Sequence, residues 1–293
     1  DKYEFVVLPE IEHISEQTAA KLDAFVKNGG VLAAAGRVGL RDSLGSPLKE
    51  SCLKTLLGVD IVDESPYSIA YFDRLKKSVA AGLPRMPILL KAAPVGELRP
   101  QYHSLRCKAD QATAVWGTFT DPQLEPDMAA GRHIYHFHAP PANHTEWPAV
   151  TCHEHGQGKV LYFAGPLTRA YAMNPSPWLR RLFAAVLAEV NLPGRVAIEG
   201  CPGLETALRQ KGRSLFLHLI PRFTEGPGAN QMPEKTVLRD VTVKIYAPKT
   251  DAVTLQPQNR PLTFQSDGDF ITIAIPPFSD WTIVTITGVS ESE

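Results

Sequence analysis

The first 36 residues alternate between short apolar runs and one amphipathic segment. Residues 5–8 (FVVL) form an unbroken apolar run, and residues 31–35 (VLAAA) form a second one. Short continuous apolar runs are typical of strands buried on both faces, as in a parallel sheet beneath helices. Between them, residues 16–27 place apolar side chains at helical spacing, with polar side chains on the opposite face. This pattern predicts a βαβ unit with a right-handed crossover.

Polar residues mark the ends of these elements. Ser15 can cap the helix, and the Asn-Gly-Gly sequence at 28–30 stops it. The loop that follows the second strand holds Arg37, Arg41 and Asp42. Ligands of open α/β sheets bind at the carboxyl ends of strands, so these three residues are candidate binding residues. The alternative is a solvated or interface loop whose Arg–Asp pair holds its own shape.

The pattern is weaker in the middle of the chain and becomes clear again later. Residues 88–90, 96–105 and 112–119 favour strands, and residues 160–164 (VLYFA) predict a central strand. The segment 177–190 predicts a strong helix that begins with a proline. Six residues are expected to form its buried face: Trp178, Leu182, Phe183, Val186, Leu187 and Val190.

The pattern of apolar and polar residues changes at residue 195. The residues that follow predict short strands joined by turns. Val241, Val243 and Ile245 alternate with polar or amphipathic residues, which indicates a strand with one solvated face. Residues 210–213 and 266–269 are typical of hairpin turns. We therefore expect an α/β domain with a parallel sheet and flanking helices over residues 1–194, and a small all-β sandwich over residues 195–293.

Composition narrows the classes of function. The 293 residues carry a formal net charge of −1, which argues against nucleic acid or an anionic membrane as the main partner. No apolar run approaches the roughly 18 residues of a membrane span. The four cysteines are far apart and form no CxxC motif, so no disulfide framework is expected. Since the chain starts at Asp1 and enters a strand almost at once, we expect it to be part of a longer protein of unpredicted localisation.

Histidines form the densest group of residues that could bind a metal or take part in catalysis. Six of the nine lie between residues 133 and 155. His136 and His138 form one pair at strand spacing, and His153 and His155 form another, so each pair shares a face. Such pairs can chelate zinc, with His144 or Glu154 as a third ligand. The commoner alternative is a strand-end histidine bonded to backbone or water. No HExxH motif or cysteine pair supports a metal site, and we predict no metal and no cofactor.

Other candidate motifs are weaker. Cys152 and His153 are neighbours on a strand and point to opposite faces, so they cannot easily share a proton. The GQGK turn at 156–159 is not a phosphate loop, because it precedes a strand instead of a helix. Three aromatic residues near polar loops could stack on a sugar, although buried packing is the alternative for each: Trp116, Tyr135 and Trp147.

Several segments together resemble a known family. Residues 6–45 (VVLPEIEHISEQTAAKLDAFVKNGGVLAAAGRVGLRDSLG) are similar to the second half of the β-galactosidase trimerisation domain of family 42 glycoside hydrolases. Residues 147–171 (WPAVTCHEHGQGKVLYFAGPLTRAY) and 177–183 (PWLRRLF) match its later pattern. Residues 203–220 (GLETALRQKGRSLFLHLI) resemble the start of the C-terminal β-domain of these enzymes and of fucosidase-like hydrolases.

This resemblance implies a flavodoxin-like fold similar to class I glutamine amidotransferases, although the amidotransferase G-x-C-x-G elbow is missing. It also implies that the catalytic carboxylates lie on a preceding TIM barrel, which is the expected missing partner. The chain has no room for eight strand–helix units. An earlier βα unit of the family's domain is missing as well, so the α/β domain is expected to be N-terminally incomplete.

Two classes of function remain open. The first is a non-catalytic accessory and oligomerisation region of a glycoside hydrolase, which forms a homo-oligomer such as a trimer and helps to wall a neighbouring carbohydrate site. The second is a stand-alone carbohydrate-binding or hydrolytic unit that uses the loop at 37–42 or the histidines at 133–155. A hydrolase needs two facing carboxylates. Nothing in the spacing pairs the available ones, which are Glu10, Glu12, Glu146 and Glu154.

Overall fold

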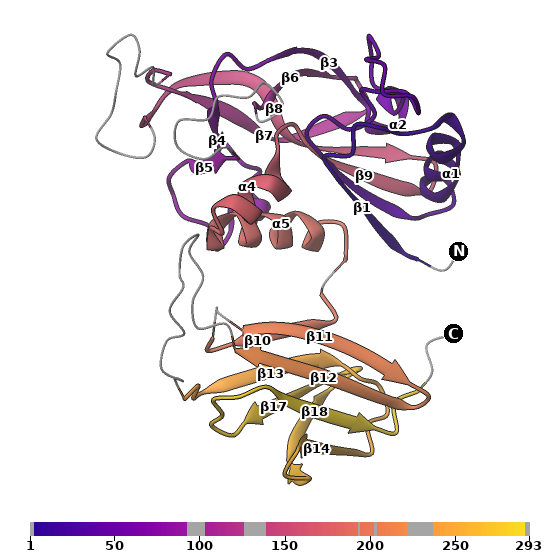
Figure 1. Cartoon of the computed structure of the whole chain (residues 1–293), viewed down its shortest axis with the longest axis vertical. Coiled ribbons are helices and arrows are strands. Elements are labelled where there is room, and N and C mark those ends of the chain that lie inside the picture. Colours follow the sequence, from indigo (N-terminus) through magenta and orange to yellow (C-terminus); the bar gives the residue numbers. More distant parts are fainter. Residues whose placement is uncertain are drawn as a thin grey trace. The chain divides into compact units, whose positions relative to one another are not determined.

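The computed structural model describes residues 3–92, 103–125, 139–192, 194–201, 204–221 and 237–290. The chain divides into two compact units: unit 1 is Asp1–Leu192 and unit 2 is Pro193–Glu293. Unit 1 combines helices and strands, whereas the described part of unit 2 contains strands without helices (Figure 1). The chain is therefore of mixed α/β character, as the apolar pattern predicted.

A seven-stranded sheet with the order β1-β2-β9-β8-β7-β4-β5 organises unit 1. Its strands are β1 (Phe5–Pro9), β2 (Val31–Ala35), β4 (Ile69–Asp73), β5 (Ile88–Lys91), β7 (Thr113–Pro122), β8 (Pro141–His155) and β9 (Gly158–Phe163). The helices are α1 (Glu16–Lys27), α2 (Lys54–Leu57), α3 (Lys77–Ala80), α4 (Leu167–Met173) and α5 (Pro177–Ala188). A separate antiparallel pair consists of β3 (Val59–Glu64) and β6 (Leu105–Ala109).

The predicted βαβ unit is present at one edge of this sheet. Strands β1 and β2 are parallel, and β2 pairs in parallel with β9. Helix α1 connects β1 to β2, and the side chain of Ser15 accepts a hydrogen bond from the backbone N–H of Thr18 at 3.2 Å. Asn28 ends the helix and Gly29 follows with a φ of 100°, which a glycine adopts without strain. The predicted helix stop is therefore confirmed.

The other half of the sheet is antiparallel. Strand β8 runs antiparallel to both β9 and β7, and β4 runs antiparallel to β7 and β5. The prediction of a parallel sheet is therefore wrong for this half. The physical reason is the connections: β8 turns directly into β9 through residues 156–157, and such a tight turn joins only antiparallel strands.

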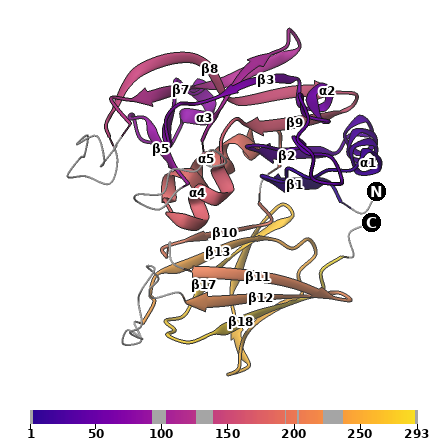
Figure 2. The same cartoon turned by 45° about the horizontal axis from the view of Figure 1, so that its top comes forward.

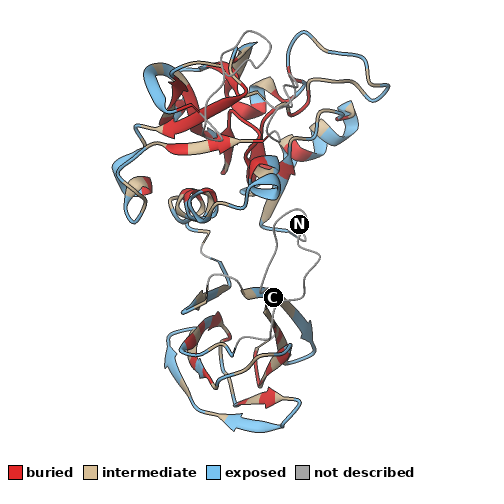
Figure 3. Cartoon of the chain, turned by 60° about the vertical axis from the view of Figure 1, so that its left-hand side comes forward, coloured by how far each residue is buried: buried red, intermediate tan, exposed pale blue. Residues whose placement is uncertain are grey.

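The sheet curls so that its two edges approach the same helix. Helix α4 contacts both β1 and β5, the two edge strands, and α5 packs against α4 and β5 (Figures 1 and 2). Helix α1 contacts β2 and β9. Burial is concentrated on the strands of the sheet (Figure 3). Tyr162, Phe72, Phe119 and Phe163 are among the largest fully buried side chains there.

Helix α5 begins at Pro177, as predicted, and Ser176 caps it. Its buried face differs from the predicted one at the start of the helix, where Leu179 is buried in place of Trp178. Leu179, Leu182 and Val186 are buried, whereas the side chain of Trp178 is 37% exposed. Trp178 instead lies against the guanidinium of Arg181, 4.9 Å from the ring centroid. An aromatic residue in a first turn can keep this exposure because a cation covers its face.

The described part of unit 2 contains two antiparallel sheets, with the orders β10-β13-β17-β16 and β11-β12-β18-β14-β15. Its strands are β10 (Val196–Glu199), β11 (Leu204–Lys211), β12 (Ser214–Pro221), β13 (Val241–Tyr246), β14 (Ala252–Gln256), β15 (Arg260–Leu262), β16 (Phe264–Asp267), β17 (Phe270–Ile275) and β18 (Thr282–Thr287). The alternate residues Leu215, Leu217 and Leu219 of one sheet and Val241, Val243 and Ile245 of the other belong to one apolar core.

Both predicted hairpin turns of unit 2 are present. The turn between β11 and β12 contains Gly212 at a φ of 54°, and the turn between β16 and β17 contains Gly268 at 61°. Strands β17 and β18 are separated at residues 276 and 277, because these two prolines lack the N–H groups that a continuous strand needs. In the described parts of the chain, none of the helices is long and apolar enough to cross a membrane.

Candidate functional site

The carboxyl ends of the three parallel strands β1, β2 and β9 lie next to one another in unit 1. Together they form an edge of the sheet that runs across the strand ends, unlike the edges formed by strands β1 and β5. Pro9 of β1 is in register with Ala35 of β2, which is in register with Phe163 of β9. The residues that follow each strand therefore gather at this edge. The predicted candidates Arg37, Arg41 and Asp42 follow β2 and lie there.

One carboxylate connects the two candidate arginines. Glu12 accepts from Arg37 Nε on Oε1 at 3.1 Å and from Arg41 Nε on Oε2 at 2.8 Å. Arg37 also forms an ion pair with Glu64 at the end of β3. The side chains of Glu12 and Arg37 are about one-fifth exposed, so water screens this cluster only in part.

Asp42 shapes its own loop. Its Oδ1 accepts hydrogen bonds from the backbone N–H groups of Leu44 at 2.9 Å and Ser46 at 2.8 Å. Arg41 Nη1 donates to the carbonyl oxygen of Gly45 at 2.9 Å. An Arg–Asp pair was one prediction for this loop, but the arginines pair with Glu12 instead. Glu12 follows β1, and the parallel pairing of β1 with β2 brings it beside Arg37. Sequence spacing alone could not show that neighbourhood.

Glu10 lies at the same edge in an unusual backbone conformation, with a φ of 50°. Its carboxylate accepts hydrogen bonds from the backbone N–H of Thr168 at 3.0 Å and from the Thr168 hydroxyl. Burial raises the pKa of Glu10 above its ordinary value, although the bonds from Thr168 oppose this effect. The carboxylate thus ties the end of β1 to the first turn of α4.

Burial raises the pKa values of three side chains in unit 1, namely Tyr162, Cys107 and Cys152. The hydroxyl of Tyr162 donates to the carbonyl oxygen of Gly36 at 2.9 Å, and burial raises its pKa well above the ordinary value. Burial also raises the pKa of Cys107 to about 12 and raises that of Cys152. Thiols with raised pKa values remain protonated and unreactive.

Both histidines of the pair on β8 already interact with other side chains of the protein. The rings of His153 and His155 have centroids 5.8 Å apart. His153 Nδ1 lies 3.0 Å from the hydroxyl of Thr113, and His155 Nε2 lies 2.7 Å from Asp23 Oδ1. Burial lowers the pKa of His153. Among the described residues, no group of three or more histidine, cysteine, aspartate or glutamate side chains could hold a metal ion.

The remaining histidine candidates lie elsewhere. His144 Nδ1 is 2.9 Å from the hydroxyl of Thr120 and 3.0 Å from Asp73 Oδ2, so its partners are on β7 and β4. Burial alone would raise the pKa of Asp73, but hydrogen bonds from Thr120, the backbone of Arg74 and His144 lower it overall. His136 and His138, like Tyr135, lie outside the described residues.

Trp147 belongs to the packing of unit 1. It lies against the apolar core, and the guanidinium of Arg106 is 5.6 Å from its ring centroid. Arg106 Nη2 pairs with Asp121 Oδ2 at 2.8 Å, and both residues are buried. Sequence reasoning missed this ion pair. Its signal was one charge near the start of β6 and an opposite charge near the end of β7.

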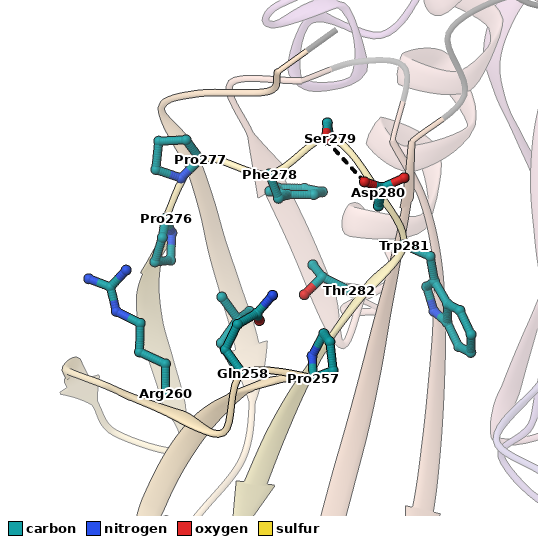
Figure 4. Close-up of a pocket in the computed structure, with 11 residues that line it drawn as sticks. Pro257, Gln258, Arg260, Pro276, Pro277, Phe278, Ser279, Asp280, Trp281 and Thr282 are labelled. Carbon is teal, nitrogen blue, oxygen red and sulfur yellow. Dashed lines mark hydrogen bonds between the residues drawn. The ribbon is translucent and has the colours of Figure 1, made fainter. Parts of the chain in front are cut away.

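Sequence reasoning also missed a pocket of about 500 Å³ in unit 2. The turn after β14 forms one wall, and the connection from β17 to β18 forms the other (Figure 4). Arg260 and Gln258 extend from the turn toward the segment that carries Pro276 and Phe278 (Figure 4). Two proline-rich segments, QPQNRP at 256–261 and IPPFSDW at 275–281, were the available signal.

No protein-family model and no curated protein matches the chain. Solved structures do. An α-L-fucosidase isoenzyme 2 from Paenibacillus thiaminolyticus superposes with a TM-score of 0.74 at 21% identity, over 99% of this chain and 41% of that one. The GH42 β-galactosidase Gan42B matches with a TM-score of 0.57 at 16% identity, over 97% of this chain and 32% of that one.

A β-galactosidase from Bacillus circulans sp. alkalophilus matches similarly, with a TM-score of 0.56 at 14% identity, over 98% of this chain and 33% of that one. This chain therefore spans about two-fifths of the fucosidase and one-third of the β-galactosidases. At these identities the likeness concerns the fold. The chain has a glycoside hydrolase-related fold, shared with part of GH42 β-galactosidases and of an α-L-fucosidase.

Proposed function

We propose that this chain is the non-catalytic accessory and oligomerisation region of a glycoside hydrolase of β-galactosidase or fucosidase type. One observation carries the proposal: the match to the fucosidase covers 99% of this chain but only 41% of that enzyme. The catalytic TIM barrel would then be a further part of the same protein. Carbohydrate is the substrate class of that whole protein in this proposal, with no nucleic acid and no membrane as a partner.

In this proposal, unit 1 corresponds to the β-galactosidase trimerisation domain, N-terminally incomplete, with a flavodoxin-like fold of the class I glutamine amidotransferase type. The parallel strands β1, β2 and β9 with helix α1 support this assignment. Unit 2 corresponds to the C-terminal β-sandwich domain, and its two antiparallel sheets around one core support that assignment. The boundary between the two domains lies near residue 194.

The chemistry of the described carboxylates favours a non-catalytic role. Retaining and inverting hydrolases need two carboxyl groups that face each other across the sugar. Glu10 is bonded to Thr168, Glu12 to two arginines, and Glu146 to Arg74 at 3.2 Å. Arg37, Arg41 and Asp42 likewise bond to Glu12, Glu64 or the backbone, so they offer little support for a stand-alone sugar site there.

An apolar surface beside strand β1 suits the assembly role. A hollow of about 240 Å³ has an almost wholly apolar lining of side chains from β1, α4 and α5, among them Val7, Tyr171 and Phe183. Val7 and Tyr171 are each 39% exposed. Among the described strands, β1 lies at one end of the sheet order. An exposed apolar patch beside it is a surface that a second copy of the chain can cover.

The mass of the chain in solution tests this proposal. Light scattering should find a closed oligomer such as a trimer, and a charge introduced at Tyr171 should dissociate it. A single-chain mass at every concentration would contradict it.

A further inference from the structure

The pocket of unit 2 lies where the chain crosses from one sheet to the other. Residues 257–259 connect β14 to β15 within the five-stranded sheet, and residues 276–281 connect β17 of the four-stranded sheet to β18. Both segments line the pocket. Its volume of about 500 Å³ is within the range of small-molecule sites, about 300–1,000 Å³.

Both walls are held in place without a ligand. Three prolines, Pro257, Pro276 and Pro277, fix their own φ angles in these walls. Phe278 exchanges two backbone hydrogen bonds with Leu238, at 2.8 and 3.2 Å. The hydroxyl of Thr282 donates to the carbonyl oxygen of Gln256 at 2.6 Å and so joins one wall to the other. A preformed pocket loses little conformational entropy when it binds a ligand.

Polar groups converge on this rigid frame. The guanidinium of Arg260 and the amide of Gln258 are exposed and extend between the walls (Figure 4). Within the described parts of the chain, the nearby amide of Gln256 bonds to Asn259 at 3.1 Å, whereas neither Arg260 nor Gln258 forms a side-chain hydrogen bond or ion pair. Ser279 and Asp280 lie on the opposite wall, with Ser279 Oγ 3.2 Å from Asp280 Oδ2. The pocket therefore combines donors on one wall with acceptors on the other.

Trp281 is not part of the binding surface, although it borders the pocket. Its ring turns away from the pocket (Figure 4) and stacks on His218, with ring centroids 5.6 Å apart and an interplanar angle of 14°. Its Nε1 donates to His218 Nδ1 at 3.1 Å. The apolar surface inside the pocket therefore comes from Leu255, the proline rings and Phe278.

We propose that this pocket binds a neutral saccharide. The C–H face of a pyranose ring packs on Phe278 and the proline rings, and its hydroxyl groups pair with Arg260, Gln258 and Asp280. The lining carries one cation and one carboxylate, so a neutral ligand is favoured over an anion. This inference adds carbohydrate recognition by unit 2 to the proposed function of the whole chain.

Ligand-observed NMR of the full chain tests this inference. Saturation-transfer difference titrations would use D-galactose, L-fucose and D-glucose as neutral probes and D-galacturonate as an anionic probe. We expect saturable binding of at least one neutral sugar, with a Kd on the order of 1 mM. Arg260→Ala and Gln258→Ala should each weaken it at least about tenfold, which equals about 1.4 kcal/mol.

Arg209→Ala is the matched control, because Arg209 is an exposed arginine of the same unit outside the pocket. It should bind as tightly as the original chain. Three results would overturn the inference: no saturable binding of any neutral sugar, an affinity of both pocket variants equal to that of the original chain, or binding of galacturonate alone. The mass of each variant by light scattering is independent of sugar binding, so this inference and the assembly proposal can fail separately.

Discussion

Glu10 accepts a hydrogen bond from the backbone N–H of Thr168 at 3.0 Å, although the two residues are 158 positions apart in the sequence. This bond connects the end of edge strand β1 to the start of α4, which also contacts the opposite edge strand β5. Glu10 occupies a left-handed backbone conformation to make it. The side chain therefore helps to close the curl of the sheet.

Replacement of Glu10 by glutamine should change how stability depends on pH. Burial raises the pKa of Glu10 from its ordinary 4.5, so folding favours the protonated carboxyl group. Its contribution to stability is full below pH 4.5 and is lost as the pH rises through the folded-state pKa. Glutamine keeps an acceptor for Thr168 but cannot ionise. The stability of Glu10→Gln relative to the original chain should therefore increase from pH 4 to pH 7.

Urea unfolding followed by tryptophan fluorescence measures this effect. Three of the four tryptophans, Trp116, Trp147 and Trp178, are in unit 1, and a Trp281→Phe background makes the signal specific for that unit. Glu16→Gln is the control, because Glu16 is an exposed residue of α1. If the free energies of unfolding of Glu10→Gln and the original chain differ by the same amount at every pH, then burial does not raise the pKa of this carboxyl group.

Glu12→Gln should destabilise unit 1 by about 1 kcal/mol, because it leaves Arg37 and Arg41 without the carboxylate that they share. The partial exposure of these side chains keeps the effect small. The same urea experiment gives the value, and Glu16→Gln should change stability by less than about 0.5 kcal/mol. If Glu12→Gln behaves like this control, then the cluster does not contribute to the fold.

Arg106→Met should be more severe. It leaves Asp121 buried without a cation, and one oxygen of Asp121, Oδ1, already has no hydrogen-bond partner among the described residues. Loss of one member of a buried ion pair costs about 3–5 kcal/mol. The double variant Arg106→Met/Asp121→Asn removes the stranded charge and should recover at least about 1 kcal/mol. A loss of less than about 1 kcal/mol in the single variant would contradict a structural role for this pair.

Local patterns predicted much of the fold. Apolar runs located β1, β2 and β9, Ser15 marked the start of α1, and the glycine turns located two hairpins in unit 2. These features depend on a few neighbouring residues, so a single sequence contains them. The antiparallel half of unit 1 was not predicted. Its strand order depends on contacts between segments far apart in the chain, such as β4 with β7.

The candidate site was harder to predict for the same reason. Arg37 and Arg41 were named from their place after a strand, but their partner Glu12 comes from another strand end. The pocket of unit 2 needs two walls, one within the five-stranded sheet and one that crosses between the two sheets, and each wall alone is an ordinary proline-bearing turn. Residue types identified the candidate binding residues. The tertiary structure determines which of these residues already bond to other protein groups.

The assembly surface can be tested by a single charge. Tyr171 borders the apolar hollow beside β1, so Tyr171→Glu would place a carboxylate in a desolvated interface. Leu44→Glu is the matched control, because Leu44 is 91% exposed in a loop of the same unit outside the hollow. We expect Tyr171→Glu to be monomeric and Leu44→Glu to keep the mass of the original chain.

The most direct test of the central claim is the mass of the unmodified chain by light scattering across a concentration series. An accessory region that assembles the enzyme should give a constant whole-number multiple of 32.1 kDa, such as three. A mass of 32.1 kDa at every concentration would contradict the claim that this chain itself carries the oligomerisation surface.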